Sequence, residues 1–598
     1  MLQRPDRKSF DLHKSLSTMP KIRSYLDPPK VISIALLLVS FVPVALAVVV
    51  TVRHWVPLPY WDEWYTPGLL LTAYARGTLS FSHFFLQHNE SRKFFPRLLY
   101  ITLAKLHGWD VRDAMAVTLF EVAAICGLLF WLFLRTKGAT TIMALVAFTV
   151  TTFLCFAPVQ YDNFLWGLVF ELFVPGLAVI LVAVVNLSRL RFGVKTVINI
   201  VLALVATYTF ANGMLLWVLG VPLPAVQERA SKRARLVWYS LFALTGAAAI
   251  ASYFVGYKRP EAHPPLHFGI LQLLHYLILW VGGYYNSTRV SPFLVGVIVS
   301  TLCIVATARA IMRLNHGAPW RHFYPWFLIS AYGLSSGVIT AMGRVGFGVE
   351  QALSTRYAVF SLFIYLGLVG TTFALYCYDQ DRIGAYRRRW IVIVSIAVIA
   401  LSAPAWSFCL HDAKRLANRT GERNARLLCA LEWMDVFPTN PDLKLIFPYP
   451  DVLRIRAHAI AGAGLLRCHL LSPRLLDQLK ETTHSSTDLS HGRLETAIVQ
   501  GNALITSGWI WPSKKNRNCV LIAFKKTTGQ VALMSVIAPT IARPDIERRY
   551  QHERMKPVGF RDQTRVSMLG EGRIEAWAVD TTAEVAWPLG ASVSATDQ

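Results

Sequence analysis

Acidic residues and cysteines are both scarce in this chain. Its 598 residues include 35 Asp and Glu against 60 Lys and Arg, and only 8 Cys. So few cysteines do not build a disulfide scaffold, and the absence of CxxC and HExxH spacings argues against a dedicated structural zinc site. The basic excess does not indicate nucleic-acid binding, because Lys and Arg cluster between apolar segments, as positive-inside retention in membranes explains. The first apolar run follows a polar, basic stretch and is long enough to span, so no cleavable signal peptide is expected.

Long apolar runs dominate what is present. Hydrophobic residues make up 54% of the chain and the mean hydropathy is +0.41. The runs reach the roughly 20 residues that a membrane span needs. The sequence therefore predicts a polytopic α-helical membrane protein with about eleven transmembrane helices. They are expected near residues 31–52, 114–135, 140–158, 164–187, 196–211, 213–226, 236–254, 292–310, 323–341, 357–377 and 389–409.

Basic residues set the orientation of these spans. The clusters at 1–30, 135–137, 188–195, 228–235, 308–321 and 381–389 fall on one side of the membrane if 196–226 crosses and returns at an Asn-Gly turn. The apolar stretch 266–286 is not counted as a span, because counting it would move the basic 308–321 loop to the other side. It is expected to be re-entrant or to lie on the surface. The N-terminus is then cytoplasmic and the C-terminal region is on the outside.

Four parts follow from this topology. Residues 1–30 form a cytoplasmic basic N-terminus, 31–409 a transmembrane domain with a long outer loop at 53–113, and 410–490 a mixed helical region on the outer side. From about residue 491 the apolar period changes to that of strands, which predicts a C-terminal β-sandwich at 491–598. Its Trp509, Trp511 and Trp577 either pack in the core or stack on a sugar ring. Cys429 and Cys468 either form a disulfide or stay as thiols.

Two adjacent acids, Asp62 and Glu63, stand in the segment PYWDEWYTP shortly after the first span. One interpretation is that the acids are solvated and that the surrounding Trp and Tyr form an interfacial belt. The other is that the acids serve a site at the outer mouth of the bundle. The loop that carries them is far longer than a connection needs, which favours the second interpretation.

The same loop carries a basic stretch, HNESRKFFPRLL, which contains His88, Glu90, Arg92, Lys93 and Arg97. A helix that begins near Pro96 would lie along the membrane with its basic edge toward the loop. These side chains either reach up to the headgroups or form a cationic patch that suits a phosphate-bearing lipid.

Polar residues near the outer ends of other spans extend this candidate site. Asp162 and Asn163 occupy the expected turn between the third and fourth spans. Glu171 is expected about 13 Å deeper, at 1.5 Å rise per residue. Together with Glu121 in the second span it predicts a water-filled vestibule, unless the carboxylates pair with a buried arginine.

A glycine-rich segment at 342–360 places Arg344, Arg356 and Tyr357 between the spans at 323–341 and 357–377. Glycines let the backbone approach a ligand closely, and the arginine fork matches phosphate oxygens. Two arginines can also be topological anchors. Arginines on the outer side run against the positive-inside bias, however, which favours a functional role.

These motifs, in this order and on this side, resemble the GT-C superfamily of membrane glycosyltransferases, which take a sugar from a polyprenyl-phosphate lipid at the outer face. WDEW at 61–64 and the layout of the spans resemble the protein O-mannosyltransferases. STRYAVFSLFIYLGL at 354–368 is similar to the start of a late span in the family-39 and aminoarabinose-transferase branches. HNESRKFFPRLL, QYDNFLWG and TFANGMLLW resemble stretches of a poorly characterised bacterial branch. The likeness covers about residues 31–409 and includes no sugar-binding repeats, so it does not identify the acceptor.

The resemblance implies a bacterial inner-membrane enzyme with a periplasmic C-terminal region, which transfers a sugar with inversion from a polyprenyl-phosphate donor to an envelope glycan or lipid. Asp62 would be the general base, and Glu63 would position the acceptor or support Asp62. Some branches use a divalent metal ion, for which Asp62, Asp162 and Glu171 are available, and others use none. The alternatives are a transporter or flippase of a lipid-linked glycan and a non-catalytic envelope assembly protein. The expected substrate-binding residues are His88, Glu90, Arg92, Arg97, Asp162, Asn163, Glu171, Arg344, Arg356 and Tyr357.

Overall fold

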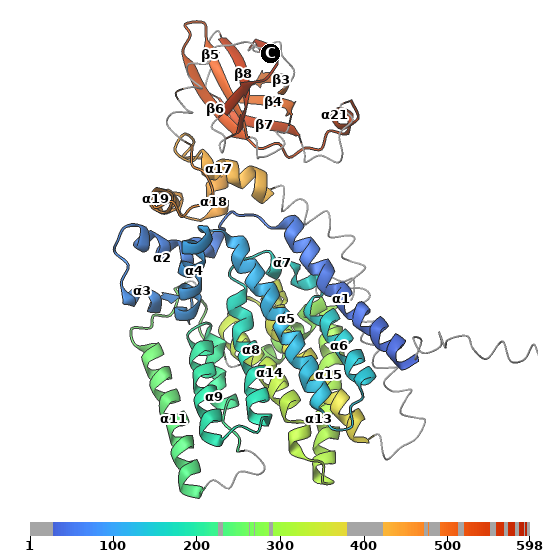
Figure 1. The fold of residues 1–598 in the computed structure, drawn as a ribbon. Helices are drawn as coiled ribbons and strands as arrows, with labels where there is room; N and C mark the ends of the chain where they lie inside the picture. The colour runs from blue at the N-terminus through green and yellow to red at the C-terminus, as the bar shows by residue number, and fades with distance from the viewer. Residues whose placement is uncertain are drawn as a thin grey trace, which may run out of the picture.

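A computed structural model describes most of the chain. The described residues are 28–224, 231–261, 263–267, 269–285, 291–379, 422–471, 477, 491–511, 519–549, 558–566, 572–580, 585–590 and 593–594. The expected span at 389–409, and all but the last three residues of the expected basic N-terminus, lie outside them. Figure 1 shows a bundle of helices at one end of the molecule and β-strands at the other, with short helices between them.

Eight helices in the described residues are long and apolar enough to cross a membrane. This is compatible with a multi-pass membrane protein, and each of the eight coincides with an expected span. They are α1 (Pro28–His54), α5 (Val111–Arg135), α6 (Thr141–Cys155, continued by short turns to Phe164), α8 (Phe170–Leu187), α11 (Lys232–Phe254), α13 (Pro292–Asn315), α14 (Tyr324–Arg344) and α15 (Ala358–Asp379). The expected span at 196–211 is the shorter helix α9 (Phe192–Thr207).

The segment expected to span at 213–226 is not a continuous helix, so this prediction was wrong. After α9 the chain turns back through the 3-10 helix η5 (Ala211–Leu215) and the single turn α10 (Leu216–Leu219), and residues 220–224 are not helical. A glycine and two prolines in 220–224 explain why the helix stops, because proline cannot donate the backbone hydrogen bond that a helix needs.

Buried amide side chains replace the missing helical hydrogen bonds of 220–224. Asn199 Nδ2 donates to the carbonyl of Gly220 at 2.9 Å, and Asn186 Nδ2 donates to the carbonyl of Val221 at 3.0 Å. Asn186 Oδ1 accepts from the amide of Leu223 at 3.1 Å. Irregular backbone is tolerated at membrane depth only where protein groups satisfy it, and these two asparagines do so.

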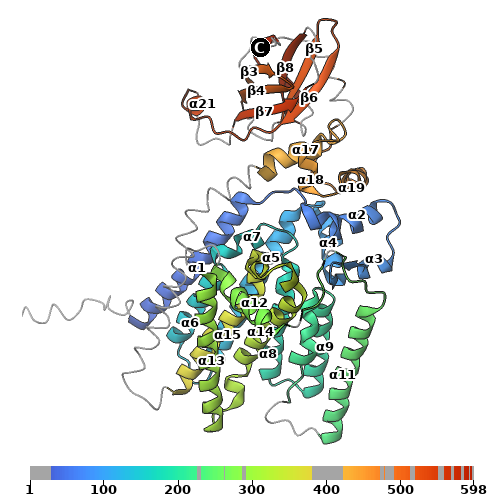
Figure 2. The same ribbon diagram turned by 180° about the vertical axis from the view of Figure 1, so that it is seen from behind.

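The bundle is packed most closely where small residues face large ones. Figures 1 and 2 place α14 and α15 near its middle, α1 and α6 at one flank, and α9 and α11 at the other. A Cβ at Gly370 of α15 would overlap the ring of Trp326 on α14, and one at Gly367 would overlap Ser330. The absence of side chains at these two positions lets the backbones of the two helices approach, as is common in membrane bundles.

The apolar stretch expected to be re-entrant or surface-lying contains a helix shorter than a span. It forms α12 (Ile270–Gly282) and the 3-10 turn η6 (Gly283–Tyr285). The first turn is exposed, with Leu271 at 83%, whereas Tyr276 and Trp280 are buried. α12 packs against α13 and against the 3-10 turn η9 (Val349–Leu353). Turns η8 (Val345–Phe347) and η10 (Thr355–Tyr357) complete the connection from α14 to α15.

The long loop after α1 folds into short elements at the end of the bundle nearest the strands (Figure 1). The helix expected near Pro96 begins two residues earlier, as α4. We call this end of the bundle the η3 end, after the 3-10 helix that contains the two acids. Its elements are η3 (Trp61–Trp64), α2 (Thr66–Ala75), α3 (Phe81–Phe85), the hairpin β1 (Gln87–His88) and β2 (Ser91–Arg92), and α4 (Phe94–His107).

Residues 422–471 pack on that loop and share one apolar cluster with it. In this cluster the fully buried Trp64 of η3 meets Trp109 edge-on at 4.9 Å between ring centroids. The elements are a π-helical turn, η11 (Glu422–Leu427), and the helices α17 (Leu428–Glu432), α18 (Asp442–Ile446) and α19 (Pro450–Gly462). Where the region predicted at 410–490 is described, it contains these short helices joined by turns and irregular segments.

The C-terminal region is a separate part with two antiparallel sheets, which share one apolar cluster. A short helix, α21 (Pro544–Arg549), lies between β6 and β7 in the chain. The three-stranded sheet has the order β3 (Gly492–Gln500), β4 (Ala503–Ile510) and β7 (Gly559–Arg565). The other has the order β10 (Val593–Ser594), β8 (Gly572–Asp580), β5 (Cys519–Lys526) and β6 (Val531–Ile537), with β9 (Val585–Pro588) also on β8.

A disulfide joins α17 to β5, between Cys429 and Cys519, with 6.0 Å between the two Cα atoms. The pairing of Cys429 with Cys468 is therefore wrong, because Cys468 is buried against the loop and its Sγ donates to the carbonyl of Pro57 at 3.7 Å. Trp509 and Trp577 are 4% and 2% exposed. For these two tryptophans the packing interpretation is confirmed.

Candidate functional site

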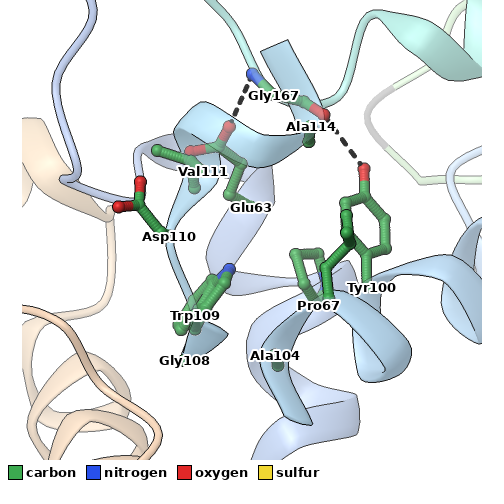
Figure 3. Close-up of a pocket in the computed structure, with 11 residues that line it drawn as sticks. Glu63, Pro67, Tyr100, Ala104, Gly108, Trp109, Asp110, Val111, Ala114 and Gly167 are labelled. Atoms are coloured by element: carbon green, nitrogen blue, oxygen red, sulfur yellow. Dashed lines mark hydrogen bonds between the residues drawn. The ribbon is translucent and has the colours of Figure 1, made fainter. Parts of the chain in front are cut away.

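Glu63 fastens η3 to the bundle. Its Oε2 accepts from the backbone N–H of Tyr60 at 2.6 Å, and its Oε1 accepts from the backbone N–H of Gly167 at 2.9 Å. Figure 3 shows the second of these bonds. Burial raises the pKa of Glu63 to about 7 against the opposing effect of these bonds and of Arg423. With 2% of its surface exposed, Glu63 is shielded from solvent, and its two bonds hold η3, which also carries Asp62, in place.

The cavity beside Glu63 in Figure 3 is too small for a substrate. It holds about 10 Å³ and is lined by Pro67, Tyr100, Trp109 and their neighbours. The Tyr100 hydroxyl donates to the carbonyl of Gly167 at 3.3 Å across it. A space of this size accommodates about one water molecule, so we do not place the site there.

Asp62 lies on the other side of η3 and is reached by solvent. Its side chain is 19% exposed. The preceding Trp61 has a φ of +55° and is 42% exposed. Bulky residues seldom adopt this left-handed conformation, and strain of this kind persists mainly where the surroundings hold it in place, as at binding sites.

His88 is the nearest titratable neighbour of Asp62. Its Nε2 lies 3.8 Å from Asp62 Oδ1, which is too far for a direct hydrogen bond. Both ring nitrogens are buried and have no hydrogen-bond partner in the described part of the chain. Tyr65 stacks on the ring at 5.8 Å between centroids. Burial and the charge of Lys93 lower the pKa of His88 to about 4, so the imidazole is neutral at pH 7.

The pKa of Asp62 is shifted the other way from that of Glu63. Burial would raise it, but the contact with His88 and the charges of Lys93 and Arg356 outweigh burial, so the pKa lies below its ordinary value. Because His88 is neutral above pH about 4, the two cations are the charged neighbours at pH 7. Asp62 is therefore an ionised carboxylate beside a neutral imidazole whose nitrogens have no partner.

Lys93 and Glu171 form a buried ion pair. Lys93 Nζ lies 2.5 Å from Glu171 Oε2, and the side chains are 7% and 1% exposed. The Tyr100 hydroxyl donates to Glu171 Oε1 at 3.1 Å. The predicted vestibule carboxylate is therefore paired, with a lysine rather than an arginine. The helical rise from which its depth was predicted does not apply, because the helix that carries Asp162, α7 (Tyr161–Phe164), ends before α8 begins, and Glu171 lies in the first turn of α8.

Arg356 is a predicted cation that remains available to a ligand. Its side chain is exposed, and its guanidinium carbon lies 5.6 Å from the ring centroid of Trp166. It makes no ion pair with any other residue that the structure describes, and its charge reaches Asp62. The neighbouring Tyr357 is 8% exposed and is part of the packed interior. An exposed arginine thus stands close to an ionised aspartate.

Glu90 and Arg344 are also brought together, from the β1–β2 hairpin and the end of α14. Their side chains form an ion pair. His263 joins both: its Nδ1 lies 3.0 Å from Glu90 Oε1, and its Nε2 lies 3.1 Å from Arg344 Nη1. The Tyr253 hydroxyl donates to the carbonyl of Glu90 at 2.7 Å. This cluster anchors the hairpin to α11 and α14, so Arg344 is already occupied.

Arg92 and Arg97 are occupied by backbone carbonyls. Arg92 donates to Tyr253 at 2.5 Å and to Phe85 at 2.8 Å. Arg97 is 2% exposed and donates to Phe84 at 3.0 Å. Burial lowers the pKa of Arg97 to about 10, which leaves it charged at pH 7. Both guanidinium groups thus donate to carbonyls near the ends of helices, Arg92 at α3 and α11 and Arg97 at α3.

Asn163 ties the turn after α6 to the segment that carries Arg356. Its Nδ2 donates to Gln160 Oε1 at 2.6 Å and to the carbonyl of Thr355 at 3.0 Å. Asn163 is 2% exposed, and Asp162 beside it is half-buried. The expected turn is therefore at the η3 end, and Asn163 acts there as a connector.

Sequence reasoning missed two arginines of residues 422–471 that touch η3. Arg456 donates to the carbonyl of Trp64 and lies 5.9 Å from the ring centroid of Tyr65. Arg423 lies 4.2 Å from the ring centroid of Tyr60. The sequence contains no signal for either contact, because the two segments are distant in the chain and share no motif.

The sequence left open whether a divalent metal is used, with Asp62, Asp162 and Glu171 available as its ligands. In the described part of the chain no group of three or more His, Cys, Asp or Glu could hold a metal ion. The three carboxylates do not form one such group, and Glu171 is occupied by Lys93.

Family models, curated proteins and solved structures all give no match. The function must therefore be argued from the site itself.

Proposed function

We propose that this chain is a membrane glycosyltransferase of GT-C type, which transfers a sugar from a polyprenyl-phosphate donor to an envelope glycan or lipid. The observation that carries the proposal is the group around Asp62. An ionised, partly exposed carboxylate lies beside a buried imidazole with no partner and within electrostatic reach of the exposed Arg356. A proton acceptor and a phosphate-binding cation are what this reaction requires.

In the proposed reaction the acceptor hydroxyl oxygen forms a bond to the anomeric carbon while the bond from that carbon to the phosphate oxygen breaks. The electron pair of the broken bond stays on the lipid phosphate, and the hydroxyl proton moves to Asp62. Attack from the face opposite the leaving group inverts the configuration. A lowered pKa keeps Asp62 ionised but makes it a weak base, so it takes the proton late, when the attacking oxygen has become acidic.

Arg356 would bind the donor phosphate and stabilise the charge that develops on it. Lys93 adds positive potential from within the protein, although Glu171 partly cancels it. Trp61, which is 42% exposed, precedes Asp62 in the chain and offers a flat surface to a sugar ring.

We place this site on the periplasmic side of a bacterial inner membrane, in a bundle of about eleven spans followed by a β-sandwich. The disulfide between Cys429 and Cys519 supports this location, because disulfides persist in oxidising compartments. The basic clusters at 135–137, 188–195, 228–235 and 308–321, which all fall on the other side in the expected topology, support it as well.

The proposal is tested by sugar transfer in membranes that contain the wild type, Asp62→Asn or Asp113→Asn, supplied with labelled polyprenyl-phosphate sugars. Asp113 is a control from the end of the same loop, where it pairs with the exposed His107. We expect transfer with the wild type and the control and loss of transfer with Asp62→Asn. Equal transfer by all three proteins would remove Asp62 from the reaction. If none of the three proteins transferred sugar, movement of a lipid-linked glycan across the membrane would be the better account.

A further inference from the structure

The two C-terminal sheets open onto a large cleft. Its volume is about 1110 Å³, the size of a ligand site rather than of a packing defect. One wall comes from β6 and β7, each the last strand of its sheet in the described order. The other wall comes from residues 437–442 and Arg426. The cleft is thus bounded by the sheets on one side and by the helical connection on the other.

Polar side chains stand on the inner face of β7, where the core needs apolar ones. Phe560 and Val566 lie in the shared core of the two sheets. Because side chains alternate along a strand, Asp562 and Thr564 point to the same inner face. They are half-buried, not sealed, and Thr564 Oγ1 donates to Asp562 Oδ2 at 2.5 Å. The side chains of Asp562 and Thr564 therefore place hydrogen-bonding groups at core positions of β7, where the core opens into the cleft.

Ser535 faces them from β6. It pairs with Ile522, a core residue of β5, and so lies on the inner face of its own sheet. Its Oγ is buried and has no hydrogen-bond partner in the described residues. A buried hydroxyl without a partner costs stability. Because Ser535 lines the cleft, rotation of its side chain would turn the hydroxyl toward a ligand hydroxyl there.

The rim of the cleft is polar as well. Arg561, Gln563 and Arg565 alternate with the inward residues of β7 and are exposed. On the opposite wall Arg426 holds Asp442 through two bonds of 2.6 and 2.5 Å. The lining therefore offers donors and acceptors close together, beside apolar side chains such as Phe437, Met534 and Ile537.

We propose that this cleft binds an oligosaccharide. A sugar hydroxyl both donates and accepts, which matches neighbouring carboxylate, hydroxyl, amide and guanidinium groups. An extended peptide added to a strand edge would need pockets for alternate side chains, whereas the inward positions of β7 at the cleft carry the hydrogen-bonding groups of Asp562 and Thr564. The site lies in the sheet region and does not depend on Asp62 or on the proposed transfer reaction.

The test uses variants that remove hydroxyls without harming the core. Ser535→Ala and Thr564→Val, combined, put apolar groups at inward positions, where they suit the interior. Thr528→Val is the matched control, because Thr528 is exposed in the turn between β5 and β6. Binding is measured by saturation-transfer NMR on the full chain in nanodiscs. The probes are linear tetrasaccharides of glucose, galactose, mannose and N-acetylglucosamine, and a seven-residue polyserine peptide serves as the competing class.

We expect at least one tetrasaccharide to bind the wild type and the Thr528→Val control equally, and to bind the double variant about tenfold more weakly, as the loss of two hydrogen bonds predicts. Thermal unfolding of the double variant at or above the wild-type temperature would exclude misfolding as the cause. The proposal is overturned if no tetrasaccharide binds, if the double variant binds as well as the wild type, or if the peptide binds and the sugars do not.

Discussion

At the scale of single residues, two adjacent acids have opposite environments. Glu63 is buried and accepts two backbone N–H groups, whereas Asp62 is partly exposed and close to cations. Burial raises the pKa of Glu63 to about 7, while neighbouring groups hold the pKa of Asp62 below its ordinary value. The pair therefore divides into one residue that holds the backbone and one that meets solvent.

Glu63 should make stability depend on pH. Its folded pKa of about 7 lies above the ordinary 4.5, so the folded chain binds the proton more tightly than the unfolded chain. The stabilisation is complete below pH about 4.5 and is lost as the pH rises through about 7. We expect the apparent melting temperature of the wild type in detergent to decrease as the pH rises from about 4.5 to about 7. We expect no such decrease in Glu63→Gln. An identical slope in both proteins would show that Glu63 does not titrate there.

Arg356 should act on the donor and not on the fold. Loss of a charged hydrogen bond to phosphate costs about 1.5–3 kcal/mol, so Arg356→Ala should raise the KM for the polyprenyl-phosphate donor about 10- to 100-fold. The exposed Arg76 lies on the same loop as Asp62, so Arg76→Ala is the matched control. Donor titrations of the three proteins give the comparison. A donor KM that is unchanged in Arg356→Ala would remove this arginine from the phosphate site.

At the scale of elements, the returning segment 220–224 depends on two buried asparagines. Asn186 and Asn199 bond its backbone inside the bundle. Asn186→Ala would remove the side-chain partners of the partly buried carbonyl of Val221 and N–H of Leu223, at a cost of about 1–2 kcal/mol. We expect a lower apparent melting temperature than in the wild type or in the control Asn315→Ala, whose side chain is exposed. Equal melting of the two variants would mean that this segment is held by other contacts.

The sequence predicts the long helices well and the short ones poorly. Runs of about 20 apolar residues have one stable form in a membrane, which is why α1, α5 and α13 lie where they were expected. The run at 213–226 is equally apolar, yet its glycine and prolines stop the helix, and its support comes from Asn186 and Asn199 on α8 and α9. Apolar content alone therefore cannot distinguish a span from a segment that neighbouring side chains support.

The candidate site was predicted in part for the same reason. Asp62 and Arg356 were named from local motifs, and the structure places them within electrostatic reach. Arg92 and Arg97 looked equally suitable, but their partners are carbonyls of α3 and α11 that no local pattern reveals. The contact of Arg456 with Trp64 joins distant segments and leaves no local trace in the sequence.

At the scale of the whole molecule, the loop that carries η3 and the C-terminal part belong to the same side. Residues 422–471 share an apolar core with the loop, and a disulfide ties them to the sheets. The far end of the bundle carries the start of α11. This follows because the end of α11 is held at the η3 end by Arg92, and 23 helical residues span about 35 Å at 1.5 Å per residue.

With the η3 end facing outward, as we propose, this arrangement predicts which residues react from each side of the membrane. Ser82 near η3, Ala532 on β6 and Arg233 at the start of α11 are all exposed. In intact cells a membrane-impermeant maleimide should label Ser82→Cys and Ala532→Cys but label Arg233→Cys only after lysis, with the wild type as background. Labelling of the first two from opposite sides would contradict the fold.

The account rests on Asp62 as the group that takes the acceptor proton, and one measurement addresses it directly. Purified wild type and Asp62→Asn are compared for donor binding and for single-turnover sugar transfer. Loss of a general base costs about 10²–10⁴-fold in rate, so the variant should bind the polyprenyl-phosphate sugar as tightly as the wild type and transfer it at least about 100-fold more slowly. Transfer by Asp62→Asn at the wild-type rate, with donor binding unchanged, would contradict the account.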